Sequence, residues 1–462
     1  MSEIINILCY KSKFLNNNEY SPMIHANKGN KKNYQTMHQI KVTRTRFILF
    51  ILMILFIGKG NVYATISIES GSKSDSTIIE YLKEFGIQTT TNKEIKILKS
   101  GHEKFIDLFE EINKAKHHIH LEYFNFRNDS IANALFDLLA KKVEEGVEVR
   151  ALFDSFGNSS NNKPLKKKHL KAIRNKGIEI EEFDPFRFPW INHAFRRDHR
   201  KIIVIDGKIG YTGGMNIADY YIKGLPEIGE WRDIHVRIEG DAVECLQDIF
   251  LDMWNKTTHQ NIQGEIYYPY SKEKTNTKNN EKEIAIVDRN PQKDTKVMRR
   301  TLAKAIESAE DKVQIINPYF TPTRIIKKAI KNALTKGIDV EIMISGKSDI
   351  PFSPDAAMYI ANSLRKKGAN IYIFNGGFHH SKVIMVDSLY CSVGSANLNS
   401  RSLRYDYEIN AFIFDKEITA QLIQIFNEDQ KNSTLLTSEM YKERSSWKKF
   451  VGWFAHLFTP FL

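Results

Sequence analysis

The stretch His199-Arg200-Lys201-Ile202-Ile203-Val204-Ile205-Asp206 is echoed later in the chain by His380-Ser381-Lys382-Val383-Ile384-Met385-Val386-Asp387. Both stretches fit the pattern HxKxxxxD. After six further residues, each is followed by a small pair and an asparagine, in Gly213-Gly214-Met215-Asn216 and in Gly394-Ser395-Ala396-Asn397. One such match arises easily by chance, whereas two aligned matches indicate a duplicated unit that carries chemistry.

Each motif contains an apolar run that is typical of a β-strand. Because side chains alternate in direction along a strand, the histidine and the lysine of each motif point the same way. The aspartate, Asp206 or Asp387, is out of phase at the strand end, so we expect it to brace the turn or a neighbouring cation. A paired imidazole and ammonium suit a phosphate, since lysine supplies positive charge and histidine attacks phosphorus or moves protons near neutral pH.

The repeat extends beyond the motifs. Predicted helices end at Gly146 and Gly177, and an apolar strand follows each of them. Gly337 and Gly368 repeat this arrangement with the same 31-residue separation. A helix, a C-terminal glycine and a strand are the expected punctuation of βα units. The sequence therefore predicts an α/β fold of two duplicated halves, each a mixed sheet flanked by helices.

The composition excludes a disordered chain, because 42% of the 462 residues are hydrophobic. The net charge of +12 favours anionic partners, either nucleic acid or an acidic lipid surface. Cys9, Cys245 and Cys391 form neither a ligand spacing nor an even disulfide framework. No carboxylate cluster at two-metal spacing accompanies the histidines, so we expect no metal and no cofactor, with cationic side chains supplying the electrostatic stabilisation.

Both ends of the chain carry signs of membrane contact. The apolar run 47–57 follows basic residues and precedes small residues that end at Ala64. It is shorter than the roughly twenty residues that span a bilayer. Its layout within residues 1–64 fits a signal peptide that opens at Met37 and is cleaved after Ala64, or a retained short anchor. In residues 441–462, aromatic side chains recur at helical spacing, which predicts an amphipathic helix at a membrane interface or a helix packed on the protein's own core.

Residues 271–283 contain no apolar side chain and are expected to be a solvated linker between a first half, 65–270, and a second half, 284–440. The first half also has an extra aromatic, proline-bearing and basic segment over residues 183–197. This segment forms either the mouth of a site or a loop that covers the core.

The paired motifs resemble the phospholipase D superfamily, in which two such motifs meet across a pseudo-twofold axis to form one active site. From about residue 92 onward the chain is similar to bacterial cardiolipin synthases, notably over 118–124, 231–240 and 376–382. Gly214 stands where the family usually has serine, so a backbone N–H would replace a hydroxyl contact there. The resemblance implies a site made of catalytic His199, Lys201, Asp206, His380, Lys382 and Asp387, substrate-binding Asn216, Asn397 and Ser395, and the histidine-orienting acids Asp233 in the first half and Glu408 in the second.

The resemblance also implies the reaction. One phosphatidylglycerol donates its phosphatidyl group to a second, which gives cardiolipin and glycerol, with His199 as nucleophile and His380 as general acid and then base. The near-symmetry of the two halves leaves the opposite assignment of the two histidines open at the level of the sequence. A hydrolytic phospholipase D is the alternative, and a nuclease of the same superfamily is less favoured. The expected partner is anionic phospholipid at the surface of the cell membrane, to which the protein is anchored or peripherally bound, rather than nucleic acid.

Overall fold

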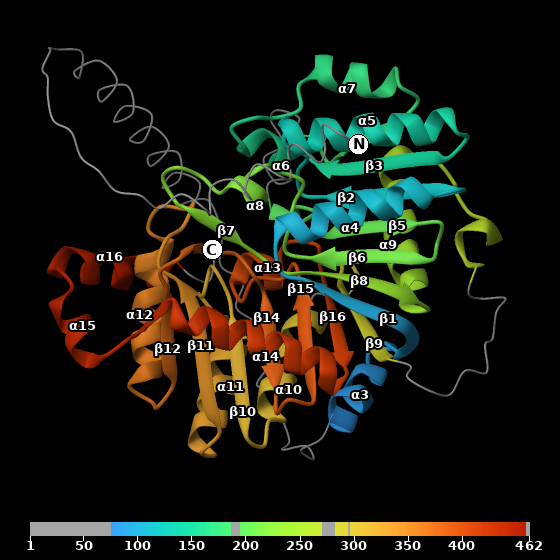
Figure 1. Ribbon diagram of the computed structural model, residues 1–462. Helices are drawn as coiled ribbons and strands as arrows, with labels where there is room; N and C mark the ends of the chain where they lie inside the picture. Colours follow the sequence, from blue (N-terminus) through green and yellow to red (C-terminus); the bar gives the residue numbers. More distant parts are fainter. Residues whose placement is uncertain (1–74, 186–194, 270–281, 294–295, 459–462) are drawn as a thin grey trace, which may run out of the picture. The chain divides into compact units, whose positions relative to one another are not determined.

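The computed structural model describes residues 75–185, 195–269, 282–293 and 296–458 (Figure 1). The first half contains, in chain order, α3 (Asp75–Lys83), β1 (Thr90–Leu98), α4 (Gly101–Lys114), β2 (His118–Tyr123), α5 (Ser130–Glu144), β3 (Glu148–Asp154), α6 (Ser155–Ser160), α7 (Lys167–Arg174), β4 (Glu179–Phe183), β5 (Lys201–Ile205), β6 (Ile209–Gly213), α8 (Tyr220–Lys223), β7 (Glu230–Arg232), β8 (His235–Gly240) and α9 (Ala242–Thr258). The second half contains β9 (Lys282–Arg289), α10 (Val297–Glu307), β10 (Lys312–Ile316), α11 (Arg324–Thr335), β11 (Asp339–Ser345), α12 (Ser353–Arg365), β12 (Asn370–Phe374), β13 (Gly377–His379), β14 (Val383–Val386), β15 (Tyr390–Gly394), α13 (Ser400–Arg404), β16 (Glu408–Phe414), α14 (Lys416–Lys431), β17 (Ser433–Leu435), α15 (Ser438–Glu443) and α16 (Ser446–Leu457).

One sheet of 15 strands runs through both halves, in the order β17-β12-β11-β10-β14-β15-β16-β9-β1-β8-β6-β5-β2-β3-β4. The order is symmetric about the β9–β1 contact, since β16, β15, β14, β10, β11 and β12 mirror β8, β6, β5, β2, β3 and β4. The sheet is mixed, as predicted: β2, β3 and β4 are parallel, whereas β5, β6 and β8 are antiparallel. The sequence predicted one sheet in each half. The two are continuous because β1 and β9 pair antiparallel, with Thr90 opposite Ile284, so neither strand leaves an open edge.

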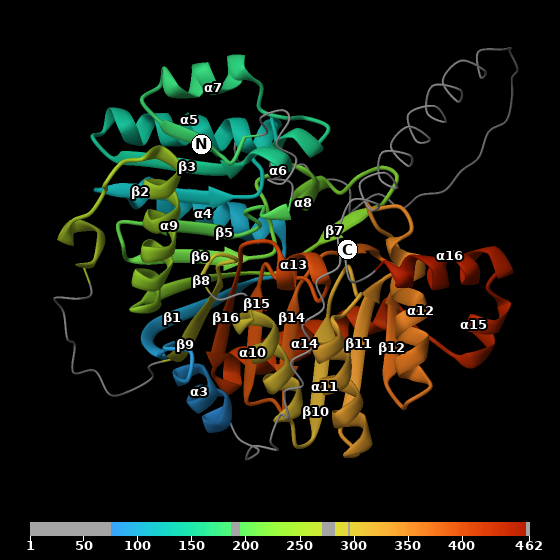
Figure 2. The same cartoon turned by 180° about the vertical axis from the view of Figure 1, so that it is seen from behind.

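Helices cover both faces of each half of the sheet. In the first half, α9 contacts β2, β5 and β8, while α4 and α5 contact β1 and β3. In the second half, α14 contacts β12, β14 and β15, while α11 and α12 contact β11 and β12. Figure 2 shows α9 crossing the first-half strands and α10 and α11 lying before the second-half strands.

The motif strand β5 shows why its sequence is an unbroken apolar run. Ile203 and Ile205 pack in the cluster that includes α4 and α5, whereas Ile202 and Val204 pack in the cluster that includes α9. A strand buried on both faces needs apolar side chains at every position rather than at alternate ones.

The prediction that glycines end these helices is also confirmed. Gly146 follows α5 at φ 88° and Gly337 follows α11 at φ 83°. A residue with a side chain rarely adopts this left-handed backbone, which is why glycine ends both helices.

The structure describes only part of the segments that were predicted to be a linker, an N-terminal membrane region and an extra loop. Strand β9 begins at Lys282, inside the segment 271–283 that was predicted to be linker; residues 271–281 lie outside the described residues. Residues 1–64, with the apolar run 47–57, also lie outside them, as does much of the segment 183–197. Within the described ranges, no helix has the length and apolar character needed to cross a membrane.

Candidate active site

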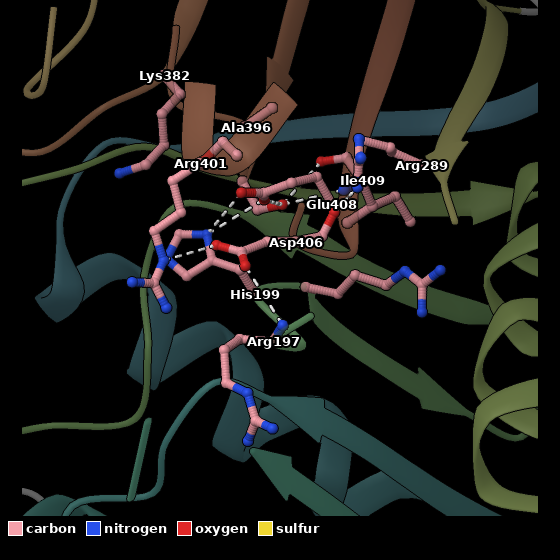
Figure 3. A network of polar contacts seen from close by, with 12 residues as sticks. Arg197, His199, Arg289, Lys382, Ala396, Arg401, Asp406, Glu408 and Ile409 are labelled. Atoms are coloured by element: carbon pink, nitrogen blue, oxygen red, sulfur yellow. Dashed lines mark hydrogen bonds and ion pairs between the residues drawn. The ribbon is translucent and has the colours of Figure 1, made fainter. Parts of the chain in front are cut away.

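His199 lies two residues before the start of β5. Its backbone N–H donates to the carbonyl of Tyr407 (3.0 Å), so the chain entering β5 runs beside the start of β16. The imidazole Nδ1 lies 3.0 Å from Oε1 and 3.1 Å from Oε2 of Glu408, the first residue of β16 (Figure 3). The acid that contacts the first histidine therefore comes from the second half.

His380 directly follows β13 and lies three residues before β14, and its acid comes from the first half. The short strand β13 pairs in parallel with β7 of the first half, and the His380 N–H donates to the carbonyl of Arg232 (2.6 Å). Nδ1 of His380 lies 2.7 Å from Oδ2 of Asp233. Each histidine thus meets the acid of the opposite half, a crossing that sequence spacing does not reveal. Because each Nδ1 faces a carboxylate, it carries the proton and Nε2 keeps its lone pair.

The two acids are held by different means. Ser395 is buried, and its hydroxyl donates to Glu408 while it accepts the N–H of Ile409 (3.0 Å). At the equivalent residue, Gly214, an added Cβ would lie 2.2 Å from Oδ1 of Asp233. The shorter acid therefore occupies the space that a side chain at residue 214 would need. The contact of Ser395 with Glu408 differs from the substrate-binding role that sequence analysis predicts for this serine.

The motif lysines are buried beside the histidines. Burial lowers the pKa of Lys201 to about 7 and that of Lys382 to about 8, because a buried ammonium loses its hydration. Repulsion from Lys382 contributes to the shift at Lys201, which shows that the two motifs share one site. Nζ of Lys382 lies 3.1 Å from Nε2 of His380. Lys382 lowers the pKa of both histidines, so its ammonium group acts on both imidazoles.

Both imidazoles favour the neutral form in this site. Burial, with repulsion from Lys201 and Lys382, lowers the pKa of His199 well below its ordinary value. Burial and repulsion from Lys382 lower the pKa of His380 to about 4. A neutral imidazole is the form that attacks phosphorus or accepts a proton.

The orienting acids have opposite shifts. Burial raises the pKa of Glu408 to about 7. Burial also acts to raise the pKa of Asp233, but attraction to Lys382 and His380 outweighs it and lowers this pKa. Asp233 is therefore the more firmly ionised of the two acids, and it stabilises positive charge on its histidine more strongly.

Asn216 and Asn397 occupy equivalent positions in the loops after β6 and β15. Both are buried, and the side-chain oxygen of each has no hydrogen-bond partner among the described residues. Rotation of either amide exchanges its oxygen with its NH₂ group, so each can present N–H donors to an anion.

Asp206 and Asp387 lie at the far ends of β5 and β14 from the histidines. The carboxylate of Asp206 accepts the N–H groups of residues 116–118 at 2.8 to 3.0 Å. The carboxylate of Asp387 accepts those of residues 310–312 at 2.8 to 2.9 Å. Each aspartate therefore braces the turn that leads into β2 or β10, as its strand phase predicted. This contact differs from the catalytic role that the family resemblance implies for Asp206 and Asp387.

More aromatic side chains lie around His380 than around His199. The ring of Phe124 lies 5.0 Å from that of His199. Four rings lie within 6.5 Å of the His380 ring, and they belong to Tyr221, Trp231, Tyr319 and Phe378. Sequence analysis did not assign these residues to the site, and only Trp231 and Phe378 lie close in sequence to residues that it did assign, Asp233 and His380.

A further network ties the two halves together beside His199. Asp406 accepts the backbone N–H of Arg197 (3.3 Å) and the side-chain Nε–H of Arg401 (3.1 Å), as Figure 3 shows. Sequence analysis also did not assign Lys104 to the site. This buried lysine donates to the carbonyls of Met215 (3.1 Å) and Asn216 (3.4 Å). This contact holds the loop that carries Asn216.

The chain matches the family model described as "Cardiolipin synthase, PLD-like domain" twice, over residues 108–254 and 302–430. The chain belongs to this family. The two matched ranges contain both motifs and the orienting acids, and they make the protein an enzyme of the phospholipase D superfamily with a duplicated domain.

Similar proteins support the same membership. Cardiolipin synthase 2 of Staphylococcus epidermidis is 39% identical over 375 residues, which are 81% of this chain and 75% of that protein. Cardiolipin synthase of Oceanobacillus iheyensis is 38% identical over 374 residues, which are 81% of this chain and 76% of that protein. The crystal structure of phosphatidylserine synthase from Haemophilus influenzae shares the fold, with a TM-score of 0.64 at 15% identity over 83% of this chain and all of that one.

Proposed function

We propose that this protein is a phosphatidyltransferase that makes cardiolipin and glycerol from two molecules of phosphatidylglycerol. The observation that carries this proposal is the pair of histidines, each oriented by an acid of the opposite half, with two buried lysines beside them. The relatives named cardiolipin synthase supply the substrate, since they match four fifths of the chain at 38–39% identity.

In the first step, the neutral Nε2 of His199 attacks the phosphorus of one phosphatidylglycerol. The P–O bond to the headgroup glycerol breaks, and His380, which has taken up a proton from solvent at Nε2 as the anionic lipid binds, donates that proton to the leaving oxygen. In the second step, His380 takes the proton from a glycerol hydroxyl of the second lipid, whose oxygen attacks the phosphorus and displaces His199. The acceptor thus enters where the first leaving group left.

The unequal acids support this division of roles. The general acid must carry a positive charge before it donates its proton, and the ionised Asp233 stabilises that charge on His380. Glu408, with its pKa raised to about 7, stabilises a charged His199 less strongly. Lys201, Lys382 and the amides of the two asparagines would hold the phosphate oxygens.

Transfer to a lipid rather than to water requires a site from which water is excluded. The rings around His380 supply an apolar wall on the side where the leaving group and the acceptor would lie. The substrates are membrane lipids, so we place the protein at the cell membrane. Two segments are candidates for the attachment: the run 47–57, which is outside the described residues, and helix α16.

The test is incubation of the purified protein with phosphatidylglycerol vesicles, followed by separation of the lipid products. Cardiolipin with an equal amount of glycerol supports the proposal. Phosphatidic acid as the only product would make the protein a hydrolase, and inertness toward lipid with cleavage of DNA would make it a nuclease. The His199→Asn variant is the control for contaminating activity.

A further inference from the structure

The exposed face of α16 is a continuous row of apolar side chains. The exposed fractions of its large apolar residues range from 42% to 69%, and they are Trp447, Phe450, Trp453, Phe454 and Leu457. The rings contact one another along the helix, with centroid separations of 5.8 to 6.0 Å from Trp447 through Phe454. Such a face is costly in water, because its apolar area is not buried against the protein.

The opposite face of α16 is fixed to the protein. Gly452 is buried, and an added Cβ would lie 2.6 Å from the carbonyl oxygen of Asp355 and 3.2 Å from Cβ of Tyr359. The ring of His456 lies 5.2 Å from that of Tyr359, and Arg444 pairs with Asp355. Both Figure 1 and Figure 2 show α16 against the start of α12. The helix is therefore held rigidly with its aromatic row outward.

The loop before α12 connects this row to the active site. Asp349 accepts the hydroxyl of Tyr319 (2.6 Å), whose ring lies 5.9 Å from that of His380. The next apolar residues of the loop, Ile350 and Phe352, are 49% and 53% exposed. Phe352 is the N-cap residue of α12, the helix on which α16 rests. Ile350 and Phe352 are thus exposed in the loop between Asp349, which contacts the wall of the site, and α12, the helix that packs against α16.

We propose that the outer face of α16 and the tip of the loop, Ile350 and Phe352, form one membrane-docking surface beside the His380 side of the site. This inference rests on the proposed function and adds to it the side from which lipid enters. The occupant is the surface of an anionic bilayer. Rings at a lipid headgroup boundary, with an apolar body and flanking cations, are the composition that such a boundary favours.

Charge supports an anionic surface. Lys448 and Lys449 lie in the first turn of α16, next to Trp447 and Phe450. Lysines close to an anionic membrane surface are attracted to it, and salt screens this attraction beyond a Debye length. The net charge of +12 acts in the same direction.

The first experiment tests docking without relying on activity. The full-length protein is bound to phosphatidylglycerol vesicles that carry brominated acyl chains, which quench nearby tryptophan fluorescence. Trp231 and Trp254 are buried, and Trp190, which lies outside the described residues, is replaced by phenylalanine in every protein compared, so Trp447 and Trp453 are expected to supply much of the quenching. The fraction quenched should fall at least twofold in the Trp447→Phe, Trp453→Phe double variant. Equal quenching in a vesicle-bound double variant would overturn the proposal.

The second experiment tests the position of the surface beside the site. The measured quantity is the ratio of activity on phosphatidylglycerol vesicles to activity on a monomeric short-chain phosphatidylglycerol. In the Ile350→Ser, Phe352→Ser double variant this ratio should fall by about tenfold, because the loop no longer inserts into the lipid boundary. An unchanged ratio would overturn the proposal.

Ile266 offers a matched control, because it is 57% exposed but lies far from the catalytic pair His199 and His380. Its neighbour Tyr267 packs against Gly207, at the end of β5 opposite to His199. The Ile266→Ser variant should keep the ratio within about twofold of the wild type. If the wild-type protein forms no cardiolipin from either the vesicles or the short-chain lipid, the proposed function fails. The quenching experiment then still decides whether α16 docks on the membrane.

Discussion

At the scale of single residues, the two histidines differ in their acids, and this difference ranks their roles. With a substrate whose leaving group needs no protonation, His380→Asn should still accumulate a covalent phosphatidyl adduct, whereas His199→Asn should form none. Mass mapping of the trapped adduct is the measurement. An adduct on His380 would reverse the assignment, and full activity in both single variants would end the catalytic interpretation.

The packing of Gly214 against Asp233 gives a second prediction. Gly214→Ala should lower kcat by about 100-fold, because displacement of Asp233 misplaces His380, and a misplacement of about 1 Å costs this much. Ser395→Ala should lower kcat by about tenfold through the loss of one hydrogen bond to a charged group.

A swap variant is the control for this prediction. Gly214→Ser combined with Asp233→Glu recreates in the first half the Ser395–Glu408 pair of the second. This double variant should recover activity relative to Gly214→Ala. No recovery, together with an intact fold by circular dichroism, would mean that the steric argument at Gly214 is wrong.

The lowered lysine pKa values predict how anion binding depends on pH. Lys201 and Lys382 are cationic below about 7 and 8, so the site attracts anions most strongly at lower pH and loses this attraction as pH rises through these values. Sulfate remains a dianion over this range, and its inhibition constant should rise between pH 6 and pH 9.5. Each deprotonation contributes a slope of up to about tenfold per pH unit.

A Lys382→Arg variant is the control, because arginine stays protonated throughout. Its sulfate inhibition should retain only the step near pH 7 that belongs to Lys201. An inhibition constant that does not change with pH in the wild type would contradict the placement of these two ammonium groups at the anion site.

At the scale of secondary-structure elements, the aspartates of the motifs fix strand ends rather than substrate. Asp206→Ala leaves three backbone N–H groups without their acceptor and should lower the free energy of unfolding by about 2 kcal/mol. Asp206→Asn should cost less, because its amide oxygen still accepts and asparagine tolerates the left-handed backbone at φ 54°. Urea denaturation measures both.

The activity of the same variants separates bracing from chemistry. Activity per folded molecule should stay within a few-fold of the wild type for both substitutions, and the corresponding variants of Asp387 should behave alike. A loss of activity as large as that of His199→Asn, without a loss of stability, would place the aspartate in the reaction.

At the scale of the whole molecule, the site depends on groups supplied by both halves and holds its own cations. Because Lys201 and Lys382 supply positive charge beside the phosphate, transfer should continue in excess chelator. Product formation from phosphatidylglycerol vesicles in the presence of a chelator is the measurement. Vesicle binding is followed in the same buffer, since divalent ions also bridge anionic lipids. Loss of activity that a divalent ion restores, with binding unchanged, would contradict metal independence.

The sequence alone determined the duplication, the fold class and the two histidine–lysine pairs around which the site is built. Each HxKxxxxD motif and each helix-ending glycine is a pattern among residues that are close in sequence. Such patterns can be read from the sequence without knowledge of the fold. The strand phase of Asp206 predicted its bracing contact for the same reason, because alternation along a strand is a property of neighbouring residues.

Only the tertiary structure decided how these residues combine. The crossing of Asp233 to His380 and of Glu408 to His199 depends on contacts between residues 147 and 209 positions apart in the chain, which no spacing encodes. Ser395 was assigned to substrate from its motif, but the fold turns its hydroxyl toward Glu408. The joining of two sheets through β1 and β9, and the seating of α16 with its rings outward, likewise follow from which surfaces meet when the chain packs. A sequence records which side chains are present, whereas distances between remote segments exist only after the core has formed.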